Sequence, residues 1–154
     1  MHPESPIPGT PRRADGPSLI VVGLDGSSTA WHAFAWACGH ARRAACPVLA
    51  VYVSTLRYWE APLAGEATAA VLEAEQSTVR ALQQEAELLA GAFDVRVSFE
   101  HRRGEAAREL LTAAREHSAD LLAIGSSVQP FHRVAGSLAS RLVRCRQVPV
   151  VVVP

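Results

Sequence analysis

Apolar and polar positions change along this chain in blocks that predict five strands separated by four helices. Short, continuously apolar runs bounded by glycine, proline or aspartate are typical of strands buried on both faces of a parallel sheet. Such runs occupy residues 19–24, 48–53, 120–125 and 148–153. The segment 94–100 instead alternates apolar and polar side chains, which predicts a strand with one face open to solvent.

Between these strands the apolar positions recur at the spacing of an amphipathic helix. We expect helices over residues 29–45, 66–91, 104–117 and 136–145. Gly91 is expected to end the second of them, because glycine readily adopts the left-handed backbone that closes many helices.

Alternation of buried strands and helices predicts an α/β fold: a three-layer, doubly wound, Rossmann-like parallel sheet of five strands. The first and fourth strands are the most uniformly apolar and suit the centre, whereas the third suits an edge. Right-handed crossovers then favour the strand order 3-2-1-4-5. We expect this domain to cover residues 18–154, after a disordered tail over 1–17 that holds five of the ten prolines.

A sheet of this order binds ligands beyond the carboxyl ends of the first and fourth strands, where the strand order reverses. Asp25 follows the first strand, and its carboxylate can accept hydrogen bonds from a nucleobase or a ribose hydroxyl. The alternative is that it caps the first helix, together with Ser27 or Ser28. Gly125 and Ser126 follow the fourth strand, where small residues allow the backbone to come close to a phosphate.

The loop after the fourth strand ends where Gly136 and Ser137 open the last helix. A helix N-terminus supplies N–H groups and positive potential to an anion, and Ser137 can add its hydroxyl. Arg133 is the only cation in this loop. The alternative is an ordinary connection from a strand to a capped helix.

Composition removes several functional classes. The 15 basic residues are all arginine, so a Walker-type phosphate loop, a Schiff-base enzyme and a kinase are excluded for lack of lysine. Equal numbers of acidic and basic residues argue against nucleic-acid binding. No apolar run approaches the roughly 20 residues of a membrane-spanning helix, and we expect no signal peptide in residues 1–18, which lack an apolar run.

The candidate chemistry of the chain is sparse. Cys38, Cys46 and Cys145 lack metal-ligand spacing, and we expect reduced thiols, small core residues of a cytoplasmic protein without a metal of its own. GxSxG, HExxH and paired-carboxylate patterns are absent from the sequence, which disfavours an enzyme.

Three stretches carry a resemblance to a known family: VVGLDGSSTAWHAFAWA, HRRGEAARELLTAAREHSADLLAIGSS and the terminal VAGSLASRLVRCRQVPVVVVP. Together they resemble the universal stress protein family, over residues 18–154. The resemblance implies the same 3-2-1-4-5 sheet, often a homodimer, and a small regulatory or stress-linked protein. Some members of the family bind ATP.

The resemblance also implies a set of nucleotide contacts. Asp25 and the backbone of Gly23 and Val53 would hold an adenine or adenosine. The ribose and phosphate side would be lined by Gly125, Ser126, Arg133, Gly136, Ser137 and Leu138.

The phosphate loop departs from the pattern of the ATP-binding members, which is Gly-x-x-Gly, nine residues, and then Gly-Ser or Gly-Thr. Val128 stands at the second glycine, only seven residues separate it from Gly136, and Pro130 stiffens the gap. A Cβ at this glycine position restricts the backbone that approaches phosphate. We therefore expect a non-catalytic, stress-type regulator that binds ATP, AMP or cyclic AMP weakly.

The alternative is a nucleotide-independent dimer that binds proteins through other surfaces. Both hypotheses include a homodimer formed through residues 149–153, because this apolar strand is an edge in the expected sheet. An uncharged edge strand invites pairing with another chain.

Overall fold

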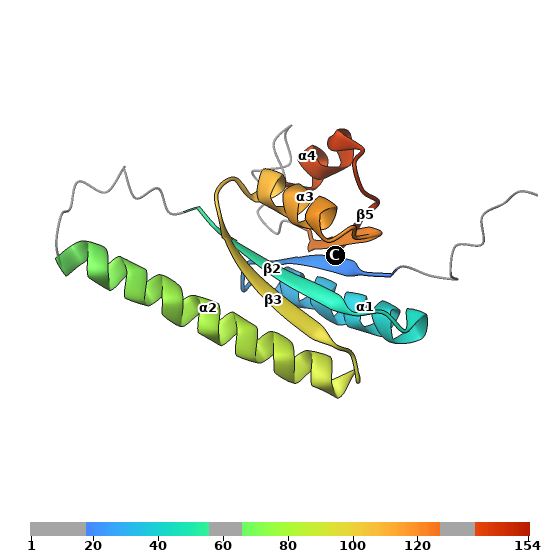
Figure 1. Ribbon diagram of the computed structural model, residues 1–154, viewed down its shortest axis with the longest axis horizontal. Coiled ribbons are helices and arrows are strands. Elements are labelled where there is room, and N and C mark those ends of the chain that lie inside the picture. The colour runs from blue at the N-terminus through green and yellow to red at the C-terminus, as the bar shows by residue number, and fades with distance from the viewer. Residues whose placement is uncertain (1–17, 56–65, 127–137) are drawn as a thin grey trace, which may run out of the picture.

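The computed structural model describes residues 18–55, 66–126 and 138–154. Strands and helices alternate along the chain, as expected (Figure 1). The elements are β1 Ile20–Leu24, α1 Ser28–Ala44, β2 Val48–Ser54, α2 Glu66–Ala92, β3 Val97–Arg103, α3 Ala106–Glu116, β4 Leu121–Gly125, α4 Leu138–Cys145 and β5 Val150–Val153. The tail 1–17, most of the loop 54–65 and the loop after β4 lie outside the described residues.

The five strands form one parallel sheet in the order β3-β2-β1-β4-β5, which confirms the predicted topology. In the centre of the sheet, Ile20 of β1 lies between Val48 of β2 and Leu121 of β4. β3 and β5 are the two edges. The carboxyl ends of β1 and β4 therefore meet at the point where the strand order reverses.

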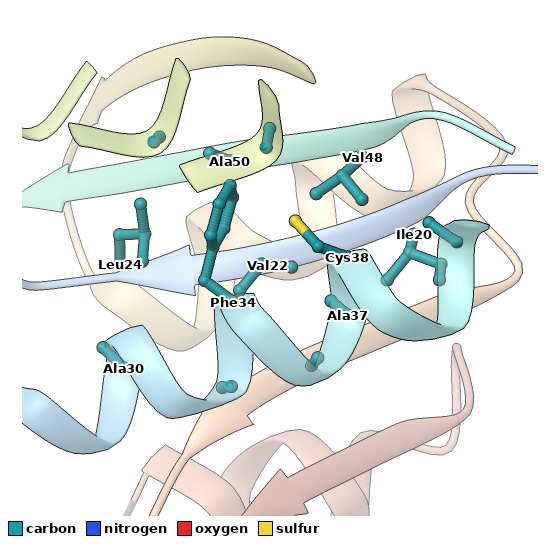
Figure 2. Packing of buried hydrophobic residues seen from close by; sticks show 14 of the residues in the cluster. Ile20, Val22, Leu24, Ala30, Phe34, Ala37, Cys38, Val48 and Ala50 are labelled. Atoms are coloured by element: carbon teal, nitrogen blue, oxygen red, sulfur yellow. The ribbon is translucent and has the colours of Figure 1, made fainter. Parts of the chain in front are cut away.

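Two apolar clusters hold helices against opposite faces of the sheet. On one face, α1 and α2 pack on alternate residues of β1 and β2, and Phe34 is the largest buried side chain (Figure 2). On the other face, α3 and α4 pack on the intervening strand residues, with Leu110 and Leu142 buried. Ala30, Phe34, Ala37, Cys38 and Ala41, which lie on one face of α1 at helical spacing, are all buried.

All four helices are followed by a left-handed residue other than glycine, with φ between 51° and 57°. These residues are Ala45, Asp94, Ser118 and Arg146. The prediction that Gly91 ends α2 is wrong, because the helix continues through Ala92. The turn is closed by the N–H groups of Asp94 and Val95, which donate to the carbonyls of Gly91 and Ala90.

β3 begins three residues later than the alternating pattern predicts, at Val97 rather than residue 94. Asp94 belongs to the left-handed turn after α2 and cannot continue a strand. At its other end β3 extends three residues further than predicted, through His101 and Arg102 to Arg103. Their side chains have partners on the neighbouring helices, which allows them to occupy a strand.

Candidate ligand site at the carboxyl ends of β1 and β4

The turn after β1 is built around Asp25 and Ser27. Asp25 Oδ1 accepts a hydrogen bond from the Ser27 N–H at 2.9 Å, and Ser27 Oγ accepts from the Ala30 N–H at 3.2 Å. Ser27 is therefore the N-cap of α1, and Asp25 braces the turn one step before it. Asp25 nevertheless remains exposed to solvent at the end of β1.

The end of β4 lies directly against the start of α1. A Cβ built on Gly125 falls 2.4 Å from the carbonyl carbon of Thr29 and 2.6 Å from the amide nitrogen of Ala30. Backbone atoms touch backbone atoms here, so only glycine fits. The same contact brings Gly125 close to the Asp25 turn, as the prediction of a shared site requires.

Three other residues of the predicted site, Gly23, Val53 and Leu138, pack on the side of the sheet that α3 and α4 cover. A Cβ on Gly23 would come within 3.1 Å of Leu110 Cδ1 and 3.3 Å of Ile124 Cγ2. The side chains of Val53 and Leu138 pack, partly buried, on the cluster of this face. These side chains form part of the fold, so any contact of Gly23 or Val53 with a ligand is left to the backbone.

The backbone N–H of Ser126 is not available to bind a phosphate. It donates to the carbonyl of Val153 at 2.7 Å and extends the pairing of β4 with β5. This donor is therefore already engaged within the sheet. The remaining predicted contacts, Arg133, Gly136 and Ser137, lie outside the described residues together with Val128 and Pro130.

A polar cluster that sequence reasoning missed joins α2 to the carboxyl ends of β2 and β3. Glu75 of α2 has a side chain only 1% exposed, yet it is fully engaged. Ser54 Oγ donates to Glu75 Oε1 at 2.5 Å, and Arg103 reaches both carboxylate oxygens, with Nε 3.3 Å from Oε1 and a terminal nitrogen 3.0 Å from Oε2. His101 Nε2 lies 2.9 Å from Ser54 Oγ and 3.3 Å from Glu75 Oε1.

Serine, histidine and glutamate here do not form a nucleophilic triad. The Ser54 hydroxyl gives its proton to Glu75, so His101 Nε2 must donate to Ser54 rather than accept from it. A general base needs the opposite direction of transfer. Ser54 is also buried, away from any incoming substrate. The cluster therefore attaches α2 to the sheet, and the paired charges stabilise a carboxylate that burial alone would disfavour.

A second polar cluster occupies the other face of β3, beside α3. Arg102 bridges Glu100 at 2.9 Å and Glu116 at 2.5 Å, while His117 Nε2 lies 2.5 Å from the other Glu100 oxygen. Burial tends to raise the pKa of Glu100, but the hydrogen bonds and charges of Arg102 and His117 outweigh it and lower the pKa below its usual value. The bond to Glu116 in turn raises the pKa of Arg102.

The cysteines are free thiols in two environments. Cys38 and Cys46 are buried, as expected, and burial raises the pKa of the Cys38 thiol to about 11. Cys145, expected in the core, is exposed at the end of α4. Across the described ranges no group of three metal-ligating side chains comes together, and no helix there is long and apolar enough to span a membrane.

Solved structures with the same fold are numerous, and two with higher sequence identity are informative. A universal stress protein family member from Burkholderia pseudomallei is 28% identical, with a TM-score of 0.73 over 89% of this chain and 96% of its own. Universal stress protein UspA from Lactobacillus plantarum is 25% identical, with a TM-score of 0.70 over 89% and 97%. Among curated protein sequences, none is similar enough to count as a relative.

More distant neighbours share the fold and were solved with nucleotides. A universal stress protein in complex with cAMP has a TM-score of 0.72 at 20% identity, covering 90% of this chain and 97% of its own. The universal stress protein of Archaeoglobus fulgidus in complex with dAMP has a TM-score of 0.63 at 20% identity, covering 92% and 100%.

The sequence comparison covers the whole described domain. The profile of the universal stress protein family matches residues 18–154, from two residues before β1 to the last residue of the sequence. It includes the Asp25 turn, the close contact at Gly125 and the edge strand β5. The shared 3-2-1-4-5 sheet agrees with this match. The chain therefore belongs to the universal stress protein family.

Proposed function

We propose that this protein binds an adenine nucleotide weakly at the carboxyl ends of β1 and β4 and acts as a non-catalytic regulator in the cytoplasm, in a stress response. The observation that carries the proposal is the direct contact between Gly125 and the first turn of α1, beside the exposed carboxylate of Asp25. A ligand at this point meets the exposed Asp25 carboxylate, a hydrogen-bond acceptor at the end of β1. The nucleotide complexes of two neighbours with the same fold support the class of ligand.

Two features support weak rather than tight binding. The N–H of Ser126 is engaged with Val153, so it is not free to donate to a phosphate. Val128 replaces the glycine that ATP-binding members carry at this point. Each lost backbone donor costs about 1–3 kcal/mol, or roughly 5- to 150-fold in affinity.

The absence of catalysis is supported by the Ser54–His101–Glu75 geometry. These residues supply the side-chain types of a hydrolase, but their proton directions oppose nucleophilic attack. A regulator instead needs only to bind a nucleotide and present a changed surface to a partner.

Calorimetric titration with ATP, AMP and cyclic AMP tests the proposal. We expect at least one of the three to bind, with ATP weaker than micromolar. Asp25→Ala should weaken binding about 10- to 100-fold, because a charged acceptor contributes roughly 1.5–3 kcal/mol. Glu85→Ala, which removes an exposed carboxylate from α2, is the matched control. No binding by any of the three nucleotides would overturn the proposal.

We also infer that β5 pairs with β5 of a second copy. Its four residues are all valine, and within the described sheet it pairs only with β4. An antiparallel contact about a twofold axis would continue the sheet across both copies. This pairing does not depend on a nucleotide, so it also serves the alternative function of a nucleotide-independent interaction module, which the engaged Ser126 donor favours.

A further inference from the structure

The long helix α2 is held against the sheet in two different ways along its length. It lies alongside β3, at one edge of the sheet (Figure 1). In its second half, Leu82, Ala86 and Ala90 are buried apolar side chains. Between residues 69 and 81 the only buried side chain is that of Glu75. The first half of the described helix is therefore fixed to the sheet by a carboxylate rather than by a buried apolar side chain.

Attachment of the helix does not by itself require a buried charge at this position. Replacing buried ion pairs by well-packed apolar side chains is often neutral or stabilising, because ions lose their hydration on burial. Leu82 and Ala86 already pack without polar groups, and an apolar side chain at position 75 would continue that pattern two turns earlier. The carboxylate of Glu75 therefore calls for another explanation, and its hydrogen bonds lead to the end of β2.

Glu75 holds Ser54, the last residue of β2, by its side chain. The Ser54 hydroxyl donates to Glu75 Oε1 at 2.5 Å and accepts from His101 Nε2 at 2.9 Å. The backbone of Ser54 is held as well, because the Gly104 N–H donates to its carbonyl at 3.0 Å. Arg103 fixes the carboxylate in turn through Oε2, at 3.0 Å. The end of β2 is thus held by α2 on one face and by the end of β3 beside it.

The peptide group just before Ser54 faces the candidate ligand site. Neighbouring residues of a parallel strand direct their carbonyls to opposite sides. Because the Ser54 carbonyl accepts from Gly104 beside β3, the Val53 carbonyl is directed toward β1. The pairing of β1 with β2 ends one residue before Val53, and the next residue in register opposite it is Asp25. A ligand that reaches the Asp25 carboxylate therefore also meets the Val53 peptide group.

These two ligand contacts are fixed in different ways. The Asp25 carboxylate is braced within its own turn by the Ser27 N–H at 2.9 Å. The Val53 peptide group lies one residue from the end of its strand, so its position depends on how Ser54 is held. The amino group of adenine is a donor that suits a carbonyl acceptor. A shift of about 1 Å would stretch such a bond beyond the range in which hydrogen bonds form.

We propose that Glu75 is a positioning residue for the adenine nucleotide: it holds Ser54 and thereby keeps the Val53 peptide group in place beside Asp25. The inference rests on the nucleotide site proposed above. It adds a residue of α2 that touches no ligand itself but determines where one wall of the site stands. The buried charge of Glu75 serves the precision of that wall, which an apolar side chain could not provide.

Calorimetric titration of full-length variants tests this role, with whichever of ATP, AMP and cyclic AMP binds the wild type most tightly. Glu75→Ala should raise the Kd about 5- to 10-fold, as expected for the loss of one ligand hydrogen bond. Glu75→Gln should recover most of the affinity, because its amide oxygen can still accept from Ser54. Ala86→Gly is the control: it weakens α2 about 16 Å farther along the helix and should change the Kd less than twofold.

Ser54→Ala tests the same contact from the side of the strand. It should raise the Kd by a similar factor, and combining it with Glu75→Ala should add less than twofold, because both substitutions remove one hydrogen bond. Independent effects would instead multiply to roughly 25- to 100-fold and would overturn the proposal. Circular dichroism establishes that each variant is folded; if Glu75→Ala is not, Ser54→Ala and Glu75→Gln carry the test.

The outcomes distinguish this inference from the function on which it rests. If Asp25→Ala weakens binding while Ser54→Ala and Glu75→Ala leave the Kd within twofold of the wild type, the nucleotide site stands and the positioning role is overturned. Equal losses in Ala86→Gly and Glu75→Ala also overturn that role, because affinity would then follow helix stability. Equal losses in Glu75→Gln and Glu75→Ala do the same, since glutamine retains the acceptor. A wild type that binds none of the three nucleotides overturns both proposals.

Discussion

Gly125 can be replaced by alanine to separate packing from ligand binding. The added Cβ would lie 2.4 Å from the carbonyl carbon of Thr29, whereas ordinary contacts begin at 3.4 Å. β4 and the first turn of α1 must therefore move apart by about 1 Å, and both are backbone segments that pack on the sheet core. Overpacking against flexible side chains costs about 1–3 kcal/mol, so we expect Gly125→Ala to lower the free energy of unfolding by about 3 kcal/mol or more.

The measurement is urea unfolding followed by circular dichroism, without nucleotide. Gly91→Ala is the matched control, because a Cβ there meets no atom within 4 Å and Gly91 lies inside α2. This control should raise the free energy of unfolding by about 0.5–1 kcal/mol. A loss below about 1 kcal/mol for Gly125→Ala would refute the packing argument and leave ligand approach as the reason for the glycine.

Two further predictions concern stability. Ala45→Gly should raise the free energy of unfolding by about 1 kcal/mol, because Ala45 has a φ of 52° that glycine adopts without strain. Ala44→Gly, at the last helical residue of α1, should instead lower it, and equal effects of the two substitutions would contradict this. The interactions with Arg102 and His117 that lower the pKa of Glu100 stabilise the fold while its carboxyl group is ionised. This stabilisation is complete above the pKa of the unfolded chain and is lost as the pH falls through the pKa of the folded protein. Glu100→Gln should therefore reduce the difference in unfolding free energy between pH 7 and about pH 3, and an unchanged difference would show that the cluster with Arg102 is not coupled to folding.

Local patterns predicted the strand order because four of the five strands are short apolar runs with helices between them. β3 was misplaced for a physical reason. Its first predicted residue, Asp94, closes the turn after α2 in a left-handed conformation that usually belongs to glycine. The strand then continues through Arg103, because α2 and α3 provide carboxylates for its arginines. Neither fact is visible in a short stretch of sequence.

The polar residues at the carboxyl ends of the strands could likewise be predicted only in part. Asp25 and Gly125 could be predicted because each directly follows a buried strand, and parallel strands end at a common edge. The Glu75 cluster could not, since its members come from three elements and Glu75 looks like an ordinary polar residue on an amphipathic helix. The available signal was the position of Glu75 two helical turns before Leu82, a buried residue of α2, because residues seven apart lie on the same face of a helix.

The charged side chains of β3 limit how far assembly can proceed. Both faces of this strand carry ion pairs, Arg102 with Glu116 and Arg103 with Glu75, whereas β5 at the opposite edge is all valine. Adding a strand beside β3 would crowd and desolvate these ions, which is a common protection against unwanted pairing. Under the pairing proposed for β5, two copies would use the one edge of the described sheet that lacks ion pairs, and no such edge would be left for a third copy. That arrangement gives a closed dimer rather than a fibre.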